Sequence, residues 1–328
     1  MDPYVELVNK ATKVMWDRQP KLYQSSIASH LLKMVGNATT PETILTVLPT
    51  GSGKSAIPQT VSFITGGITI IIESTLALGS DQTQKIRDIE TEPHSNKHIK
   101  AYQLDSFKTR QEKDSLSDAI LKHCSSNSYT SIILFTSPEC LLDNIWKQFF
   151  KDAVAKGFLK LFCIDEIHLF VEFGLTFRKR FISLKDYIFS EIIDNASTLK
   201  VPLLLMTATF NESLLYLCKR MIGIEIHQKN MYWGNYKIYQ KRHIHINIKY
   251  TKQYYRFIKN QLKQHLQDNH NYKAIIISNT SRTATKAQNE VERWLNIKNK
   301  LNGDTLLIVG NQETELMLEY ATAFTNAH

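Results

Sequence analysis

The stretch LPTGSGKS, residues 48–55, decides the fold that this chain can adopt. It follows the apolar, β-branched run TILTVLP at residues 43–49, which is typical of a buried strand, and it leads towards a helix. A glycine-rich turn at that place lets backbone N–H groups surround a phosphate at the helix N-terminus. In such a P-loop, Lys54 reaches the β- and γ-phosphates of a nucleotide and Ser55 holds Mg²⁺. Leu48 stands where the general pattern G-x-x-x-x-G-K-[ST] begins with glycine.

A glycine turn that arose by chance is the alternative, and the strand before it and the Lys-Ser pair after it disfavour that alternative. The P-loop residues expected to bind ATP are Thr50, Gly51, Ser52, Gly53, Lys54 and Ser55.

A second chemical element follows another apolar run. Asp165 and Glu166 end the stretch LKLFCIDE at residues 159–166. One carboxylate of such a pair binds the metal, here Asp165 together with Ser55, and the other polarises the attacking water. An acid pair alone also occurs at helix N-caps. Together with the P-loop it predicts a nucleoside triphosphatase site.

The order of apolar and helical segments predicts an α/β fold. Near-continuous apolar runs are typical of parallel strands covered on both faces, and strand–helix alternation indicates a doubly wound sheet with helices on both faces. The expected strands are residues 43–49, 68–74, 131–137, 159–166 and 201–209. Helical patterns cover residues 81–91, 112–123, 139–155 and 211–222.

A change of pattern divides the chain after the first sheet. We expect an ATP-binding domain over residues 1–227, a linker or first edge strand over 228–250, and a second α/β unit over 251–328. That last segment is shorter than the roughly 100–150 residues that a full domain of this type needs. It is therefore expected to be an incomplete domain.

Composition limits the partners and the compartment. The 40 Lys and Arg residues and the 31 Asp and Glu residues give a net charge of +9, which is compatible with a polyanionic binding partner such as nucleic acid. The four cysteines are far apart and form no C-x-x-C pair, so no disulfide partner and no zinc site are expected. Neither a signal sequence nor an apolar run long enough for a bilayer is visible, which indicates an intracellular protein without a membrane partner.

At this point the motifs resemble a known family. Lys54, Asp165, Glu166 and His168 resemble the Walker elements of superfamily 2 helicases in the D-E-x-H form. That resemblance implies a RecA-like P-loop fold and makes these four residues the candidate catalytic residues. HLFVEFGLTFRK at residues 168–179 is similar to the aromatic-rich loop that follows this motif in the RecQ group.

In that loop Phe173 takes the position of a tryptophan, and Gly174, Phe177 and Arg178 match the family. The resemblance implies that Phe170, Phe173 and Phe177 contact DNA bases and that Arg178 serves phosphate or ATP. Stacking of a base on an aromatic ring is worth about 1–3 kcal/mol and tolerates any sequence. For Phe170 and Phe177, packing in the core is the alternative.

Other motifs of the RecQ group occur in the expected order. ESTLALGSDQ at residues 73–82 resembles a DNA-backbone motif and keeps Asp81 and Gln82, with Glu73 and Ser74 in place of Ser-Pro. TATF at residues 207–210 resembles the motif that links ATP state to domain motion through Thr207 and Thr209.

PKLYQ at residues 20–24 resembles the F-R-x-x-Q element, and this implies that Gln24 reads adenine. Lys21 and Pro20 replace the arginine and the aromatic residue of that element. AIIISNTSRTATKAQNEVERWL at residues 274–295 resembles the opening of a second RecA-like domain. The motifs that carry the family's arginine finger would follow His328, so we expect a chain truncated within that domain.

The resemblance implies an ATP-dependent 3′–5′ DNA helicase of RecQ type that uses ATP and Mg²⁺ on single-stranded or forked DNA. A non-unwinding core that binds ATP and nucleic acid, and an RNA helicase of the wider superfamily, are the alternatives. The compartment would be the nucleus of a eukaryote or the cytoplasm of a bacterium. The oligomeric state stays open.

Overall fold

The structure is a computed structural model of the 328-residue chain. It describes residues 2–36, 43–73, 76–91, 98–104, 108–126, 129–169, 201–210, 212–222, 226–234, 256–258, 260–261 and 281–298. The chain divides into two compact units, Met1–Arg242 and His243–His328. In the second unit the described residues include the helix α12, Ser281–Lys298.

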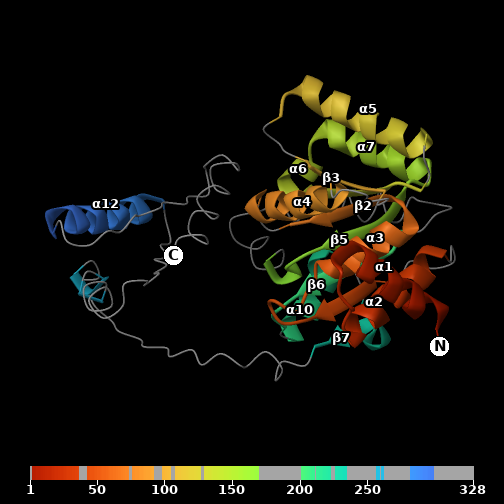
Figure 1. The fold of residues 1–328 in the computed structure, drawn as a ribbon, viewed down its shortest axis with the longest axis horizontal. Helices are drawn as coiled ribbons and strands as arrows, with labels where there is room; N and C mark the ends of the chain where they lie inside the picture. The colour runs from red at the N-terminus through yellow and green to blue at the C-terminus, as the bar shows by residue number, and fades with distance from the viewer. Residues whose placement is uncertain are drawn as a thin grey trace. The chain divides into compact units, whose positions relative to one another are not determined.

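The first unit is built on a parallel sheet in the order β3-β4-β2-β5-β6-β1-β7 (Figure 1). The strands are β1 Thr43–Val47, β2 Gly67–Ile72, β3 Ile99–Gln103, β4 Ser131–Thr136, β5 Leu159–Ile164, β6 Leu203–Thr207 and β7 Met231–Trp233. All five expected strands are confirmed, and so is the doubly wound α/β class. β2 and β4 are buried at every residue, as near-continuous apolar runs predict.

Two of these strands were not clearly indicated by the sequence. β3, IKAYQ, lies at one edge of the described sheet and mixes buried with half-buried residues, so it lacks the apolar run of a central strand. β7 lies in the segment expected to be a linker or a first edge strand, and it pairs in parallel with β1.

Helices cover both faces of the sheet. They are α1 Pro3–Trp16, α2 Leu22–Gly36, α3 Ala56–Thr65, α4 Leu76–Thr91, α5 Arg110–Ser126, α6 Pro138–Leu141, α7 Asn144–Ala155 and α10 Glu212–Leu217, which continues into a π-helical turn, Cys218–Ile222. A short 3₁₀ turn, Gln228–Asn230, precedes β7. α5 and α7 pack side by side (Figure 1).

Two apolar clusters separate the faces. Residues of α1, α2, α3 and α4 pack with Ile44 and Leu204, whereas residues of α5, α6, α7 and α10 pack with Leu45 and Leu205. Consecutive strand residues thus point to opposite faces, as the pleat of a strand requires. The cysteines Cys124, Cys140, Cys163 and Cys218 are buried in these clusters. Within the described ranges, no helix has the length and apolar character needed to cross a membrane.

This topology collects the chemical residues at one edge. Because all the strands are parallel, their carboxyl ends lie at the same side of the sheet, where ligands bind in open α/β folds. The P-loop follows β1, Asp165 and Glu166 follow β5, and Thr207 ends β6, which lies between β1 and β5.

Candidate nucleotide site

The loop after β1 has the turn geometry that a phosphate loop needs. Gly51 and Gly53 have φ angles of 75° and 86°, in the left-handed region that glycine adopts without strain. The Ser52 N–H donates to Pro49 O at 3.1 Å and closes the turn. A Cβ atom on Gly53 would lie 2.7 Å from Gln24 Nε2, so a side chain at this position would displace the Gln24 amide.

The start of α2 supports the loop from outside. Gln24 Nε2 donates to Gly53 O at 2.9 Å, and Gln24 Oε1 accepts from the backbone N–H of Lys21 at 2.8 Å. The structure therefore places Gln24 against the P-loop with both ends of its amide engaged. Its predicted role in reading adenine stays a prediction.

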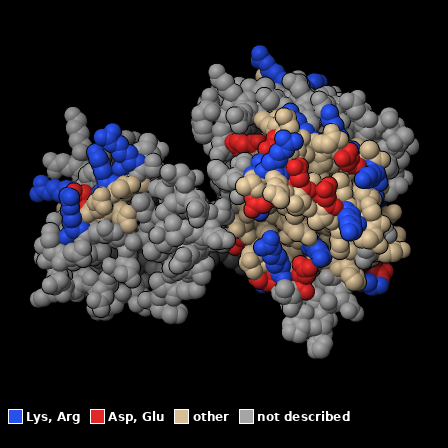
Figure 2. Space-filling view, turned by 90° about the horizontal axis from the view of Figure 1, so that it is seen from above, with Lys and Arg blue, Asp and Glu red and all other residues tan. Residues whose placement is uncertain are grey.

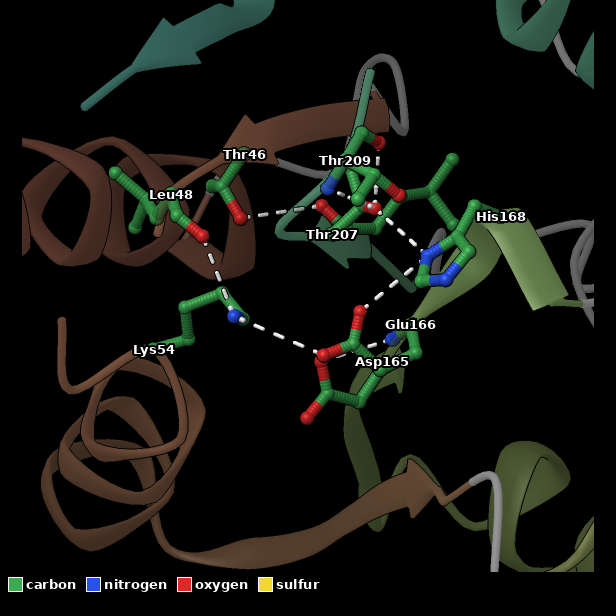
Figure 3. Close-up of polar contacts among 9 residues, drawn as sticks. Thr46, Leu48, Lys54, Asp165, Glu166, His168, Thr207 and Thr209 are labelled. Carbon is green, nitrogen blue, oxygen red and sulfur yellow. Dashed lines mark hydrogen bonds and ion pairs between the residues drawn. The ribbon is translucent and has the colours of Figure 1, made fainter. Parts of the chain in front are cut away.

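Lys54 joins the loop to the acid pair. Its side chain is buried, and its ammonium donates to Leu48 O at 3.3 Å and lies 3.8 Å from Glu166 Oε1 (Figure 3). An ammonium held between a loop carbonyl and a carboxylate stands where a phosphate would meet both the loop and the acids.

Asp165 is a buried carboxylate with partial compensation. Its Oδ1 accepts from the backbone N–H of Glu166 at 2.9 Å, and its own N–H donates to Ile72 O at 3.0 Å. Burial, followed by the charge of Glu166, raises the pKa of Asp165 to about 6, although the Glu166 N–H and the Lys54 charge oppose that shift. The ordinary pKa is 3.8, so the folded structure disfavours the charged form of Asp165, and keeping Asp165 charged lowers the stability of the fold.

Glu166 has a strained backbone conformation. Its φ is 47°, in the left-handed region that costs a non-glycine residue about 1–2 kcal/mol. Strain of this kind concentrates at functional sites, where the surrounding structure maintains it.

His168 links the acid pair to the end of β6. Its Nδ1 lies 3.0 Å from Thr207 Oγ1 and 3.3 Å from Glu166 Oε2 (Figure 3). Thr207 Oγ1 donates to Thr209 O at 2.8 Å and accepts from the Thr209 N–H at 3.1 Å. The predicted residues Glu166, His168, Thr207 and Thr209 therefore form one polar chain between β5 and β6.

One residue at this edge was not expected to belong to the site. Glu73 directly follows β2, its side chain is buried, and its backbone N–H donates to Thr136 O at 2.9 Å. Burial, and then the charges of Asp165 and Glu166, raise the pKa of Glu73 to about 8. The sequence shows an acid after the run ITIII, but only the strand order shows that β2 lies beside β5.

The oxygen atoms around the loop fit a nucleotide with Mg²⁺. The Ser52 hydroxyl is buried, and the part of the chain that the structure describes offers it no hydrogen-bond partner. Ser55 precedes α3 without a capping hydrogen bond from its side chain. Hydroxyl and carboxylate oxygens are the ligands that Mg²⁺ prefers, so Ser55 and Asp165 could hold it. Within the described residues, no three His, Cys, Asp or Glu side chains lie together in a way that could hold a metal ion.

Other predicted residues lie on α4 or outside the described ranges. On α4, Asp81 pairs with Lys85, and Gln82 Oε1 accepts from Gln59 Nε2 of α3 at 3.0 Å. Phe170, Phe173, Phe177 and Arg178 lie outside the described residues, so the aromatic loop stays a prediction. On the face drawn in Figure 2, basic and acidic side chains of the first unit are intermingled, so the positive balance forms no single patch there.

Comparison with known proteins assigns these motifs to a family. The family model of the DEAD/DEAH box helicases matches residues 23–216, which is more than half of the chain and includes the P-loop, the acid pair and Thr207. A putative ATP-dependent DNA helicase Q1 of Caenorhabditis briggsae is 28% identical over 187 residues, which are 56% of this chain and 27% of that protein. The probable ATP-dependent DNA helicase RecS of Bacillus subtilis is 29% identical over 140 residues, 43% of this chain and 24% of that protein. The chain thus matches about a quarter of the length of these relatives.

Solved structures show the same fold. The structure of Mss116p bound to ssRNA and AMP-PNP has a TM-score of 0.63 at 15% identity, over 98% of this chain and 61% of that one. The DUF1998 helicase MrfA has a TM-score of 0.56 at 14% identity, over 91% of this chain and 42% of that one. At such identities the likeness concerns the fold alone.

Proposed function

Because the chain belongs to the DEAD/DEAH box helicase family, we propose that it is an ATP-driven motor of RecQ type that moves 3′ to 5′ on single-stranded DNA. The observation that carries this proposal is the approach of Lys54 Nζ to Glu166 Oε1, 3.8 Å apart at the carboxyl edge of the sheet. Two motifs far apart in the sequence meet there, as hydrolysis of a nucleoside triphosphate requires. Relatives named as ATP-dependent DNA helicases support DNA as the track.

In this proposal each residue of the edge has one task. The P-loop N–H groups and Lys54 bind the β- and γ-phosphates, and Ser55 with Asp165 holds Mg²⁺. Bound Mg²⁺ neutralises charge that develops on the phosphate oxygens. Glu166 orients the attacking water and accepts its proton. Gln24 recognises adenine, and its hydrogen bond to Gly53 O holds the P-loop in place.

The remaining chain would convert hydrolysis into movement. His168, Thr207 and Thr209 would couple the nucleotide state of the site to β6. The coupling would run through the contact of His168 Nδ1 with Thr207 Oγ1 at 3.0 Å and through the hydrogen bond from Thr207 Oγ1 to Thr209 O at 2.8 Å. The residues proposed to contact DNA or to couple DNA binding to hydrolysis are Phe170, Phe173, Phe177, Arg178, Asp81 and Gln82. The same proposal includes an ATP-binding domain over residues 1–227, a linker over 228–250 and an incomplete second RecA-like domain over 251–328. It also includes a location in the nucleus of a eukaryote or in the cytoplasm of a bacterium.

The test is Mg-ATP hydrolysis by this chain alone, with single-stranded DNA, with RNA of the same sequence and without nucleic acid. Lys54→Ala is the variant, and Lys10→Ala, which replaces an exposed lysine of α1 paired with Glu6, is the matched control. We expect DNA to stimulate turnover more than RNA does, and we expect turnover to be lost in Lys54→Ala and kept in Lys10→Ala.

A second assay tests direction. Partial duplexes with a single-stranded tail on the 3′ or the 5′ side separate the two polarities, and we expect unwinding only from the 3′ tail. Stronger stimulation by RNA would favour the RNA-helicase alternative. ATP-sensitive DNA binding without turnover would favour a non-unwinding core, and a failure to bind ATP would refute the proposal.

A further inference from the structure

One carbonyl of the P-loop receives two side-chain donors from the start of α2. Ser52 O accepts from the Tyr23 hydroxyl at 2.7 Å and from the Lys21 ammonium at 3.2 Å. The two donors also lie together, since Lys21 Nζ is 5.8 Å from the centroid of the Tyr23 ring. A carbonyl oxygen has two lone pairs, so both bonds can be made at once.

These bonds fix the direction of a peptide unit. In a planar trans peptide the C=O of one residue and the N–H of the next point in opposite directions. Holding Ser52 O towards α2 therefore turns the Gly53 N–H away from α2, and holding Gly53 O with Gln24 does the same for the Lys54 N–H. Consecutive N–H groups turned to one side are what an anion-binding loop presents.

The loop needs such support because of its own sequence. Gly51 and Gly53 flank Ser52, and glycine occupies left-handed and right-handed regions about equally well. The peptide between Ser52 and Gly53 can therefore rotate at little cost unless something outside the loop holds it. Tyr23 provides the shorter of the two bonds and has fewer rotatable torsions than Lys21, so it loses less entropy when it does so.

We propose that Tyr23 is a positioning residue for phosphate binding, which orients the Ser52–Gly53 peptide of the P-loop through its hydroxyl. Lys21 acts as the second, weaker support of the same carbonyl. This inference rests on the proposed nucleotide site. It adds a residue of α2 that touches neither the reacting atoms nor, in this role, the base.

The experiment compares Tyr23→Phe, which removes the hydroxyl and keeps the ring, with Tyr4→Phe, which removes a hydroxyl from α1. Inhibition constants for ATP, ADP and GTP are measured by displacement of a fluorescent ATP analogue, and unfolding temperatures are measured without nucleotide. Loss of one hydrogen bond predicts that Tyr23→Phe binds each nucleotide about 3- to 10-fold more weakly than Tyr4→Phe. The ATP-to-GTP ratio should not change, because the base is not involved, and the unfolding temperature should fall only slightly, as the loss of one hydrogen bond predicts.

A double variant extends the test. Tyr23→Phe with Lys21→Met removes both supports, and we expect a larger loss than with either change alone, again equal for the three nucleotides. Affinities within twofold of Tyr4→Phe would overturn the inference, and so would a changed ATP-to-GTP ratio, which would place Tyr23 at the base. If wild-type chain binds no nucleotide, the proposed function itself fails. If wild type binds and Tyr23→Phe binds equally well, only this inference fails.

Discussion

The neighbouring strands β2 and β5 are each followed by a buried carboxylate, and the two carboxylates differ in how far their pKa values are raised. Ile72 lies opposite Ile164 in the register, so Glu73 and Asp165 occupy equivalent positions one residue later. Asp165 receives the N–H of Glu166 and the nearby charge of Lys54. No lysine or arginine in the described part of the chain lowers the pKa of Glu73.

Both carboxylates are buried, so the difference comes from the hydrogen-bond donor and the positive charge near Asp165, which Glu73 lacks among the described residues. These partners decide which carboxylate stays charged. The pKa of Asp165 is raised to about 6 and that of Glu73 to about 8. At neutral pH Asp165 is therefore mostly charged and Glu73 mostly protonated. In the proposed site, the edge of the sheet would then offer the charge of Asp165 to a metal ion without the charge of Glu73 beside it.

The largest effect should come from removing the compensated carboxylate. Asp165→Asn keeps the size of the side chain and removes the charge proposed to hold Mg²⁺, so we expect ATP turnover to fall by at least about 100-fold. Glu73→Gln, its matched control, should stay within about threefold of wild type. Steady-state hydrolysis at pH 7.5 measures both, and an equal loss in Glu73→Gln would contradict the division of roles.

The next effect concerns stability and pH. In the unfolded chain Glu73 has its ordinary pKa of 4.5, and in the folded protein the pKa is about 8. Between these values the folded state binds a proton that the unfolded state has lost, so the free energy of unfolding falls as pH rises. Asp165 contributes with the same sign between 3.8 and about 6.

We therefore expect Glu73→Gln to be more stable than wild type at pH 9, by about a few kcal/mol or about 5–10 °C in unfolding temperature. The gap should close towards pH 5. Thermal unfolding in chelator across this range measures it. A gap that is constant with pH would show that the glutamine acts by packing alone.

A smaller effect tests the link that runs from Glu166 through His168 to Thr207 of β6. His168→Ala and Thr207→Val each break the bond between His168 Nδ1 and Thr207 Oγ1, 3.0 Å long. We expect each change to lower nucleic-acid-stimulated turnover about 5- to 20-fold, and the double variant to lose no more than one of them, because both remove the same coupling.

Thr46→Val is the matched control for that link. Thr46 is buried on β1, and its hydroxyl donates to Leu205 O at 3.3 Å, on the same strand as Thr207. It should cost stability and leave the stimulation by nucleic acid unchanged. Full additivity of the His168 and Thr207 changes would mean that they act separately.

The smallest effect comes from the uncharged neighbour of Glu73 on the other side. Ser137 follows β4 in the register of Glu73 and caps α6, since its Oγ accepts from the Cys140 N–H at 3.3 Å. Ser137→Ala should cost about 1 kcal/mol at every pH between 5 and 9. Thermal unfolding checks this, and a cost that varies with pH would show that Ser137 shares in the titration of Glu73.

Sequence reasoning predicted what depends on local pattern. The loop after β1, the acid pair after β5 and the apolar strands carry their signal in adjacent residues, and the structure brings Lys54 and Glu166 together as expected. β3 was missed because an edge strand does not need a continuous apolar run. α1 was not predicted either, although its N-cap Asp2 and Pro3 at the first position are a recognisable helix start.

What could not be predicted depends on distant residues. The burial of Glu73 follows from the order of β2 and β5, which no local pattern contains. The contacts of Tyr23 and Lys21 with Ser52 O exist only once α2 packs against the loop. The resemblance assigned Gln24 to adenine, and that role stays a prediction; the hydrogen bonds of its amide to Gly53 O and to the Lys21 N–H could not be predicted from the sequence.

The left-handed backbone of Glu166, with φ of 47°, has a consequence for engineering this chain. Glycine and asparagine accept that conformation more readily, so replacing Glu166 with either would relieve strain while removing the carboxylate. Under the proposed function, stability and turnover should therefore change in opposite directions at this position, which makes it a site where a more stable chain is a less active one.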